Sequence, residues 1–260
     1  MKIRLKKNRR ILIGERMAAN TKGKGKKTRR CEKTQSNAVQ KLYDACKEVF
    51  ASSHTGFIPS WHHMKMLRAI LDDINPTDVG LHSEMPYFRN GNSTSITYLH
   101  IFENEYFSIG IFCLPPSSVI PLHNHPGMTV FSKLLFGTMH VKSYDWEEDA
   151  AATTTQEENQ AKARLAKVKM DGEMSAPCEA SVLYPAEGGN IHCFTAISAC
   201  AILDVLGPPY SSPDGRHCTY FSNCGNGEGE MEGYAWLEEI KKPEELHMVG
   251  EMYAGAKIFF

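Results

Sequence analysis

Short β-rich segments separated by turn signals limit the fold of this chain more than any other feature of its sequence. Apolar and β-branched residues dominate each segment, and polar or glycine-containing stretches such as Glu103-Asn104-Glu105 and Gly137-Thr138 mark hairpin turns. The predicted strands are 96–102, 106–113, 129–136, 139–144, 182–184, 191–197, 201–206 and 217–221. Closely spaced strands of this kind predict a sandwich or a barrel, with double-sheet jelly rolls and cupins among the options. We therefore expect an all-β core.

Residues 37–75 show helical rather than strand periodicity. Apolar side chains recur every three or four residues in two stretches. They are Leu42, Ala45, Val49 and Phe50 in the first, and Leu67, Ile70, Leu71 and Ile74 in the second. Ser60 is suited to cap the second helix, and Asn75-Pro76 to stop it. Because both apolar stripes are moderate, the two helices are expected to pack outside a larger body. This predicts a helical segment at 37–91 and a barrel domain at 92–260, with a solvated loop at 147–164.

The first 36 residues differ sharply in charge from the rest. They hold fourteen Lys or Arg against two acidic residues, a net charge of +12, whereas the remainder carries −13. Such a composition predicts a disordered basic tail at 1–36. The cluster at 22–30 is dense enough for a nuclear-import signal, and a weak contact with polyanions is the alternative. Met17 is an alternative start of the chain.

Cellular location is constrained by what the sequence lacks. The apolar stretch 11–13 is far too short for a secretory signal, and no run reaches the roughly 18 apolar residues of a membrane span. The cysteines form no C-x-x-C pair; they are Cys31, Cys46, Cys113, Cys178, Cys193, Cys200, Cys218 and Cys224. Free thiols in a reducing compartment are therefore expected. We expect an intracellular protein without membrane contact.

Three histidines are the candidate metal ligands. His123 and His125 form an H-x-H pair, and alternate side chains of an extended strand face the same side. His192 follows Gly188-Gly189, which permits a sharp turn. A strand so distant in sequence can complete the set if the sheet closes on itself. Histidines in an exposed, proline-flanked loop are the alternative reading.

Asp204 is the single carboxylate in the apolar run 200–206. A buried carboxylate needs a partner, because desolvating an unpaired charge is costly. An edge position that faces solvent is the alternative. We expect Asp204 to face the interior and to act there as a catalytic or substrate-contacting group.

Four motifs carry a resemblance to a known family. They are His-Asn-His-Pro-Gly-Met at 123–128, Ser-Tyr-Asp-Trp at 143–146, Leu-Tyr-Pro with Gly-Gly-Asn-Ile-His within 183–192, and Leu-Asp-Val-Leu-Gly-Pro-Pro-Tyr at 203–210. In these motifs the chain resembles plant cysteine oxidases, which belong with the cysteamine dioxygenase-like thiol dioxygenases of the cupin superfamily. The resemblance covers residues 37–260 and not the basic tail. It implies a double-stranded β-helix, the jelly-roll or cupin barrel, with the two N-terminal helices outside.

The resemblance implies that His123, His125 and His192 bind a mononuclear iron(II), Fe(2+). Ordinary cupins place a ligand carboxylate about four residues after the second histidine, where this chain has Thr129. Three neutral imidazoles leave up to three positions of an octahedral iron open, which suits a thiolate and O2 together. Transfer of both oxygen atoms to sulfur would then oxidise a thiol to a sulfinic acid.

The resemblance also implies the substrates, namely proteins that begin with cysteine after removal of the initiator methionine. A free amino acid would need a guanidinium for its carboxylate. The predicted strands offer no inward arginine, and Arg216 only precedes one. Asp204 would contact the α-ammonium of the cysteine. Oxidation would feed the N-degron degradation pathway, with transcription factors among the targets, and so report oxygen and hypoxia.

Three further residues resemble family positions near the pocket. Tyr210 resembles a tyrosine near the pocket entrance that contacts substrate, and an anchor for the Pro-Pro-Tyr loop is the alternative. Cys218 and Tyr220 resemble a Cys-x-Tyr pair that cross-links in the animal relative. Ordinary core packing explains both residues equally well, so we expect them beside the site without assuming a cross-link.

Two other functions fit the same residues. One is a three-histidine cupin that acts on a small metabolite with zinc or manganese, as an isomerase or hydrolase. The other is a non-catalytic cupin binding module, brought to chromatin by its basic tail. The sequence favours the oxidase without a direct nucleic-acid role, located in both nucleus and cytoplasm. No dimerisation helix is evident, so a monomer is expected.

Overall fold

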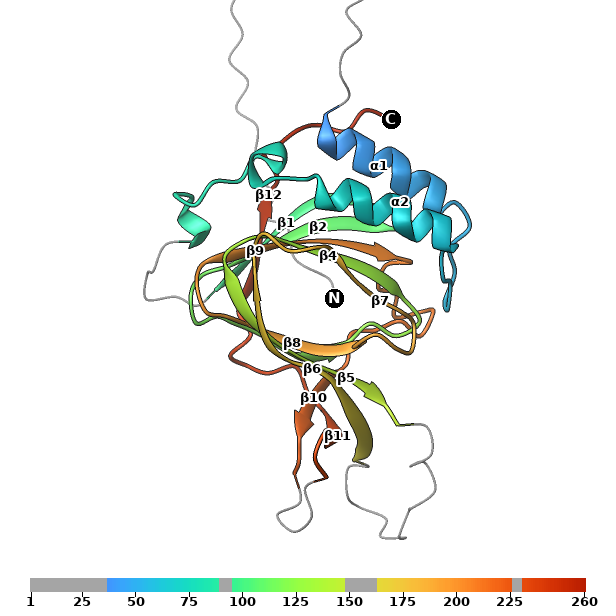
Figure 1. The fold of residues 1–260 in the computed structure, drawn as a ribbon, viewed down its shortest axis with the longest axis vertical. Helices are drawn as coiled ribbons and strands as arrows, with labels where there is room; N and C mark the ends of the chain where they lie inside the picture. The colour runs from blue at the N-terminus through green and yellow to red at the C-terminus, as the bar shows by residue number, and fades with distance from the viewer. Residues whose placement is uncertain (1–36, 89–94, 148–162, 226–230) are drawn as a thin grey trace, which may run out of the picture.

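The computed structural model describes residues 37–88, 95–147, 163–225 and 231–260. Across these ranges two helices are followed by twelve strands (Figure 1). The predicted basic tail at 1–36 and most of the predicted loop at 147–164 lie outside the described residues. Both predictions therefore remain predictions.

Both predicted helices are present, and side-chain caps explain where they begin. The Asn37 side chain accepts a hydrogen bond from the Gln40 amide at 2.8 Å, and the Ser60 hydroxyl accepts one from the His63 amide at 3.2 Å. The cap predicted at Ser60 is thus confirmed. The predicted stop, Asn75-Pro76, opens a short 3-10 helix instead. The bounds are α1 Ala38–Val49, α2 Trp61–Asp72, η1 Pro76–Val79 and η2 Pro86–Phe88.

The strands form two sheets that face each other. Their bounds are β1 Ile96–Glu103, β2 Ser108–Leu114, β3 Val119–Asn124, β4 Thr129–Phe136, β5 Thr138–Trp146, β6 Arg164–Ser175, β7 Ser181–Leu183, β8 Ile191–Ala196, β9 Cys200–Gly207, β10 Tyr220–Asn223, β11 Tyr234–Ile240 and β12 Met248–Met252. The first sheet has the order β12-β1-β2-β9-β4-β7. The second, β10-β11-β6-β5-β8-β3, closes on itself because β10 also pairs with β3. The result is a double-stranded β-helix, the predicted cupin barrel.

The first sheet has a core on each face. Figure 1 shows α1 and α2 side by side across its outer face. Strand β9 illustrates the alternation: Leu203 and Val205 pack in the core beneath the helices, whereas Cys200 and Ile202 pack in the barrel interior. By the same alternation Asp204 points into the barrel, as predicted.

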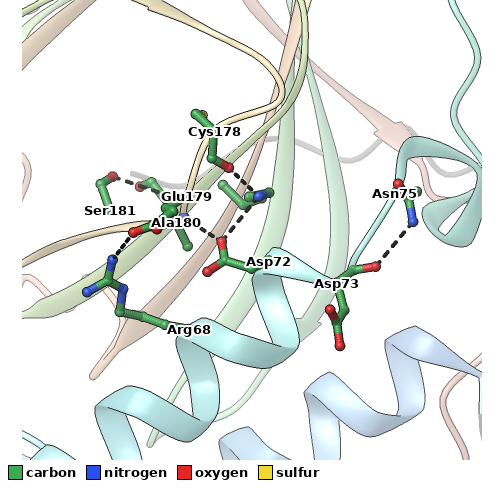
Figure 2. A network of polar contacts seen from close by, with 10 residues as sticks. Arg68, Asp72, Asp73, Asn75, Cys178, Glu179, Ala180 and Ser181 are labelled. Atoms are coloured by element: carbon green, nitrogen blue, oxygen red, sulfur yellow. Dashed lines mark hydrogen bonds and ion pairs between the residues drawn. The ribbon is translucent and has the colours of Figure 1, made fainter.

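An ion pair between Asp72 of α2 and a buried lysine of the sheet links the helix to the barrel (Figure 2). Nζ of Lys133, on β4, lies 3.2 Å from Oδ1 of Asp72, and the lysine side chain is 8% exposed. The same carboxylate accepts a hydrogen bond from the Ala180 amide at 2.6 Å. One turn earlier Arg68 pairs with Glu179 at 3.1 Å, in an exposed contact that contributes little. Because the lysine ammonium is buried, loss of the Asp72 carboxylate would leave a buried charge without its ion-pair partner, so this contact is expected to help fix how α2 sits on the sheet.

The list of predicted strands lacks four that the structure contains, β3, β6, β11 and β12, although the H-x-H pair was expected in an extended strand. Strand β6 escaped because every second residue faces solvent and several of these are charged, as at Lys167, Lys169 and Asp171. Its opposite face is only partly buried, so it carries no apolar run. Strand β12 is an exposed edge strand that pairs in parallel with β1. Their pairing partners, rather than their own composition, define these strands.

The helical segment and the barrel share one core. Val39 and Leu42 of α1 pack in the same buried cluster as Ile109 and Ile111 of β2. The boundary predicted between 37–91 and 92–260 therefore crosses a continuous core and stays a prediction. No helix in the described ranges is long and apolar enough to cross a membrane. All seven cysteines within those ranges carry free thiols, as expected.

Candidate metal centre

The three predicted histidines lie together inside the barrel. His123 is in β3, His125 follows the end of β3, and His192 is in β8. Their candidate ligand atoms all lie within 4.8 Å of one another, and each residue is at most 8% exposed. This excludes the exposed-loop alternative. The third histidine comes from a strand distant in the sequence and the sheet closes on itself, as expected, but direct pairing brings the residues together, because β3 and β8 are hydrogen-bonded neighbours in which His123 directly faces His192.

Hydrogen bonds hold one nitrogen of each ring. Nδ1 of His123 lies 2.8 Å from the Pro121 carbonyl, and Nδ1 of His192 lies 3.2 Å from the Gly189 carbonyl. Nδ1 of His125 lies 2.9 Å from the Tyr210 hydroxyl. A carbonyl oxygen only accepts, so Nδ1 carries the proton in the first two rings. The Tyr210 hydroxyl donates to the Asn124 carbonyl at 2.8 Å, so its oxygen accepts from His125. Each ring is left with Nε2 as its unprotonated nitrogen, the arrangement common in metal centres.

Burial keeps the cluster neutral. Desolvation lowers the pKa of His123 and lowers the pKa of His125 well below its usual value. Desolvation, followed by the charge of His123, lowers the pKa of His192 to about 3. Three neutral imidazoles at physiological pH are the form that coordinates a metal, so the donor set fits a divalent transition-metal ion.

Thr129 stands where other cupins carry a ligand carboxylate, and its side chain is engaged elsewhere. It is fully buried, and its Oγ1 donates to the Phe57 carbonyl at 2.7 Å, in the loop before α2. The metal-ligand group found in the described ranges contains three histidines and no carboxylate. The centre therefore carries no negative charge of its own from these side chains.

Asp204 is buried in the barrel and incompletely paired. It is 6% exposed, and its Oδ1 has no hydrogen-bond partner among the described residues. Desolvation raises its pKa to about 7, although a hydrogen bond from Ser132 opposes the rise. The solvent-facing alternative is excluded. An orphaned buried carboxylate oxygen is costly unless a ligand supplies the missing donor.

The surroundings of Asp204 include residues that the sequence reasoning missed. Its neighbours across the two adjoining strands are Ser132 on β4 and Gly110 on β2. Gly110 leaves no space for a side chain, because the hydroxyl of Tyr98 occupies the place of a Cβ. No pattern in the sequence marked these residues, since pairing register alone brings them to Asp204.

Tyr210, Cys218 and Tyr220 form a hydrogen-bonded group beside the histidines. The thiol of Cys218 hydrogen-bonds the side chains of both tyrosines, and the Tyr220 ring centroid lies 6.4 Å from that of His123. Burial raises the pKa of Tyr210 well above its usual value, so its hydroxyl stays protonated. Tyr210 contacts His125 directly, which places it among the groups that orient the centre. Its contact with substrate stays a prediction.

Arg216 is committed to structural contacts. Its guanidinium donates to the Pro209 carbonyl at 3.0 Å and to Thr55, and it pairs with Asp214 at 3.2 Å. The residue is 7% exposed. Its side chain is therefore not free to bind a substrate carboxylate.

A small, mostly apolar cavity adjoins the histidine cluster. Its volume is about 80 Å³, and His192, Phe194, Ile202 and Leu134 lie along it. Mostly apolar side chains therefore surround the space next to His192.

Fold and site together define a class: a cupin barrel with a three-histidine metal centre. The PCO_ADO family model matches residues 70–258. Plant cysteine oxidase 2 of Arabidopsis thaliana is 56% identical over 88% of this chain and 86% of its own length. Plant cysteine oxidase 1 of the same plant is 55% identical over 85% and 80%. The 2-aminoethanethiol dioxygenase of Homo sapiens is 31% identical over 65% and 70%. The chain belongs to the PCO_ADO family of thiol dioxygenases, which confirms the predicted resemblance.

Proposed function

We propose that this protein is an iron(II)-dependent dioxygenase that oxidises the N-terminal cysteine of proteins to cysteine sulfinic acid. The observation that supports this proposal most directly is a buried cluster of three neutral histidines without a carboxylate among the described residues. Iron(II) held by His123, His125 and His192 would supply activation of O2 beside a sulfur atom. The overall reaction balances, because both atoms of one O2 molecule join one thiol to give one sulfinic acid.

Oδ1 of Asp204 has no hydrogen-bond partner among the described residues, which supports a role in binding a charged amine of the substrate. The α-ammonium of an N-terminal cysteine has the donors that Oδ1 lacks, and its charge would favour the ionised carboxylate. Ser132 holds the carboxyl from β4 and thereby orients it. Asp204 would thus bind the substrate amine rather than the metal.

A peptide substrate suits the rest of the pocket better than free cysteine does. Free cysteine carries a carboxylate, for which the buried Arg216 is not free. In a peptide that carboxyl group is already an amide and needs no cation. The proteins named above as relatives are called cysteine oxidases and a 2-aminoethanethiol dioxygenase, and 2-aminoethanethiol likewise pairs a thiol with an amine.

Mass spectrometry of a Cys-initiated peptide incubated with the iron-loaded protein under ¹⁸O2 tests the proposal. A gain of two ¹⁸O atoms is expected. Three matched peptides serve as controls: one N-acetylated, one with an internal cysteine only, and one beginning with alanine. Zinc- and manganese-loaded protein should be inactive. No oxygen gain with iron, or equal oxidation of the internal cysteine, would rule the proposal out, and turnover of another substrate with zinc would favour the metabolite enzyme.

The cellular role is proposed from the same chemistry. A sulfinic N-terminus made only when O2 is present marks proteins for the N-degron pathway, with transcription factors among the targets, so the enzyme would act as an oxygen sensor. We place it as a monomer in nucleus and cytoplasm. The basic cluster at 22–30 supports the nuclear fraction.

A further inference from the structure

The loop that leads into β8 is folded around one carboxylate. Asp145 accepts hydrogen bonds from three consecutive amides: Oδ2 from Gly188 at 2.9 Å, and Oδ1 from Gly189 at 2.8 Å and from Asn190 at 3.1 Å. Both glycines have φ of 82°, which L side chains rarely adopt, so glycine is needed for these amides to converge. Asp145 is 9% exposed, and Lys169 lies 3.5 Å from its Oδ2.

Asn190 extends this loop to one of the histidines. Its Oδ1 accepts from the His125 amide at 3.0 Å, and its Nδ2 donates to the His125 carbonyl at 2.8 Å. Nδ2 also donates to the Tyr184 carbonyl at 2.6 Å. Asn190 is 6% exposed, so these bonds are shielded from competing water. Both backbone polar groups of His125 are thereby bound by one side chain.

The same loop holds a second histidine. The Gly189 carbonyl accepts the hydrogen bond from Nδ1 of His192 at 3.2 Å, while the Gly189 amide is bound by Asp145. Asp145 touches neither ring. It nevertheless holds the two loop residues, Gly189 and Asn190, that contact His192 and His125.

We propose that Asp145 and Asn190 are positioning residues that set the relative placement of His125 and His192 for the metal. This inference rests on the metal-binding role proposed above. His125 lies beyond the last residue of β3, so strand pairing does not hold it as it holds His123. A metal requires its donors within about 0.2 Å of their ideal distances, which an unsupported loop residue does not guarantee.

Two near-isosteric substitutions in the full-length protein test this role. Asp145→Asn turns one acceptor into a donor that faces the loop amides. Asn190→Asp keeps the acceptor for the His125 amide but turns the donor toward two carbonyls into another acceptor. Asp171→Asn is the matched control, because Asp171 pairs with Lys142 and His140 on the exposed face of the same sheet. Cobalt(II) is the probe, since its visible absorption reports ligand geometry and a competing chelator reports affinity.

Both variants should fold yet bind cobalt about tenfold to hundredfold more weakly, with a changed visible spectrum. The rise in melting temperature on adding cobalt should shrink in both, which a purely structural role would not cause. The Asp171→Asn control should match the parent. The inference is overturned if both variants bind cobalt with the affinity and the visible spectrum of the parent. If only Asn190→Asp folds, the same result in that variant alone overturns it. His192→Ala separates the two claims: if it binds cobalt as the parent does, the metal centre itself is wrong.

Discussion

His123 and His192 face each other across the β3–β8 pair, with ring centroids 4.7 Å apart. The two residues are direct partners in the register of antiparallel neighbours. A slip of one residue would turn one of the two rings to the outer face of the sheet, because side chains alternate. The metal centre therefore depends on pairing register, and each ring is expected to be indispensable.

Replacing His192 with alanine should abolish iron retention and lower turnover by at least about a hundredfold, because two imidazoles remain. Iron content by elemental analysis and sulfinic acid formation by mass spectrometry measure both effects. His140→Ala is the control, since that histidine lies on β5 in an exposed pair with Asp171. If the His192→Ala variant oxidises the peptide at the rate of the parent, His192 is not a ligand of the metal.

Replacing Asp204 with asparagine should leave iron bound while peptide oxidation falls. Loss of a charged hydrogen-bond partner worth about 1.5–3 kcal/mol implies roughly a tenfold to hundredfold decrease in kcat/KM. Steady-state kinetics with a Cys-initiated peptide measures this decrease, and Asp171→Asn again serves as the control. Unchanged kinetics in a folded variant would give Asp204 a structural role only.

The same substitution should change how stability depends on pH. Burial raises the pKa of Asp204 from 3.8 to about 7, so the folded state binds its proton more tightly than the unfolded state does. This proton binding contributes fully to the stability of the folded state below pH 3.8, and the contribution is lost as pH rises through 7. As pH rises from 4 to 8, the free energy of unfolding of Asp204→Asn should increase relative to that of the parent by up to about 4 kcal/mol, because asparagine does not titrate. Urea unfolding across this range checks it, and a constant difference would contradict the burial assignment.

Tyr210→Phe distinguishes two roles for that hydroxyl. Loss of its bonds to His125 and to the Asn124 carbonyl should weaken metal binding about fivefold to thirtyfold, the range for one or two bonds of about 1 kcal/mol each. Cobalt titration gives the affinity and peptide kinetics gives KM. A raised KM with unchanged metal affinity would instead favour the substrate contact predicted from the sequence.

Deleting residues 1–36 should leave iron content and melting temperature nearly unchanged, because a segment of +12 without apolar periodicity contributes no core. Neutralising the cluster at 22–30 in a bulky fluorescent fusion should shift the protein toward the cytoplasm. Imaging of nuclear fractions measures the shift, and a bulky fusion excludes passive entry. Equal fractions for the intact and neutralised fusions would remove the import role.

Much of this architecture was accessible from the sequence, because it is encoded locally. Helical spacing and the Ser60 cap predicted the two helices, and alternating apolar residues with turn signals predicted most of the barrel strands. The H-x-H pair and the family motifs identified the three histidines. Strand β6 was missed because its charged outer face hides a strand that pairing alone defines.

Tertiary structure decided which groups meet. Pairing register brings Ser132 and Gly110 to Asp204 and leaves its Oδ1 without a partner. Chain folding places the Tyr210 hydroxyl on His125 and the Asp145 carboxylate on the loop before His192. Spacing along the sequence carries none of these contacts, since each joins residues tens of positions apart. The sequence by itself identifies the residues that bind and orient a metal. Their tautomers, their burial and the unpaired oxygen of Asp204 depend on which strands pair, because that pairing determines the neighbours of each side chain.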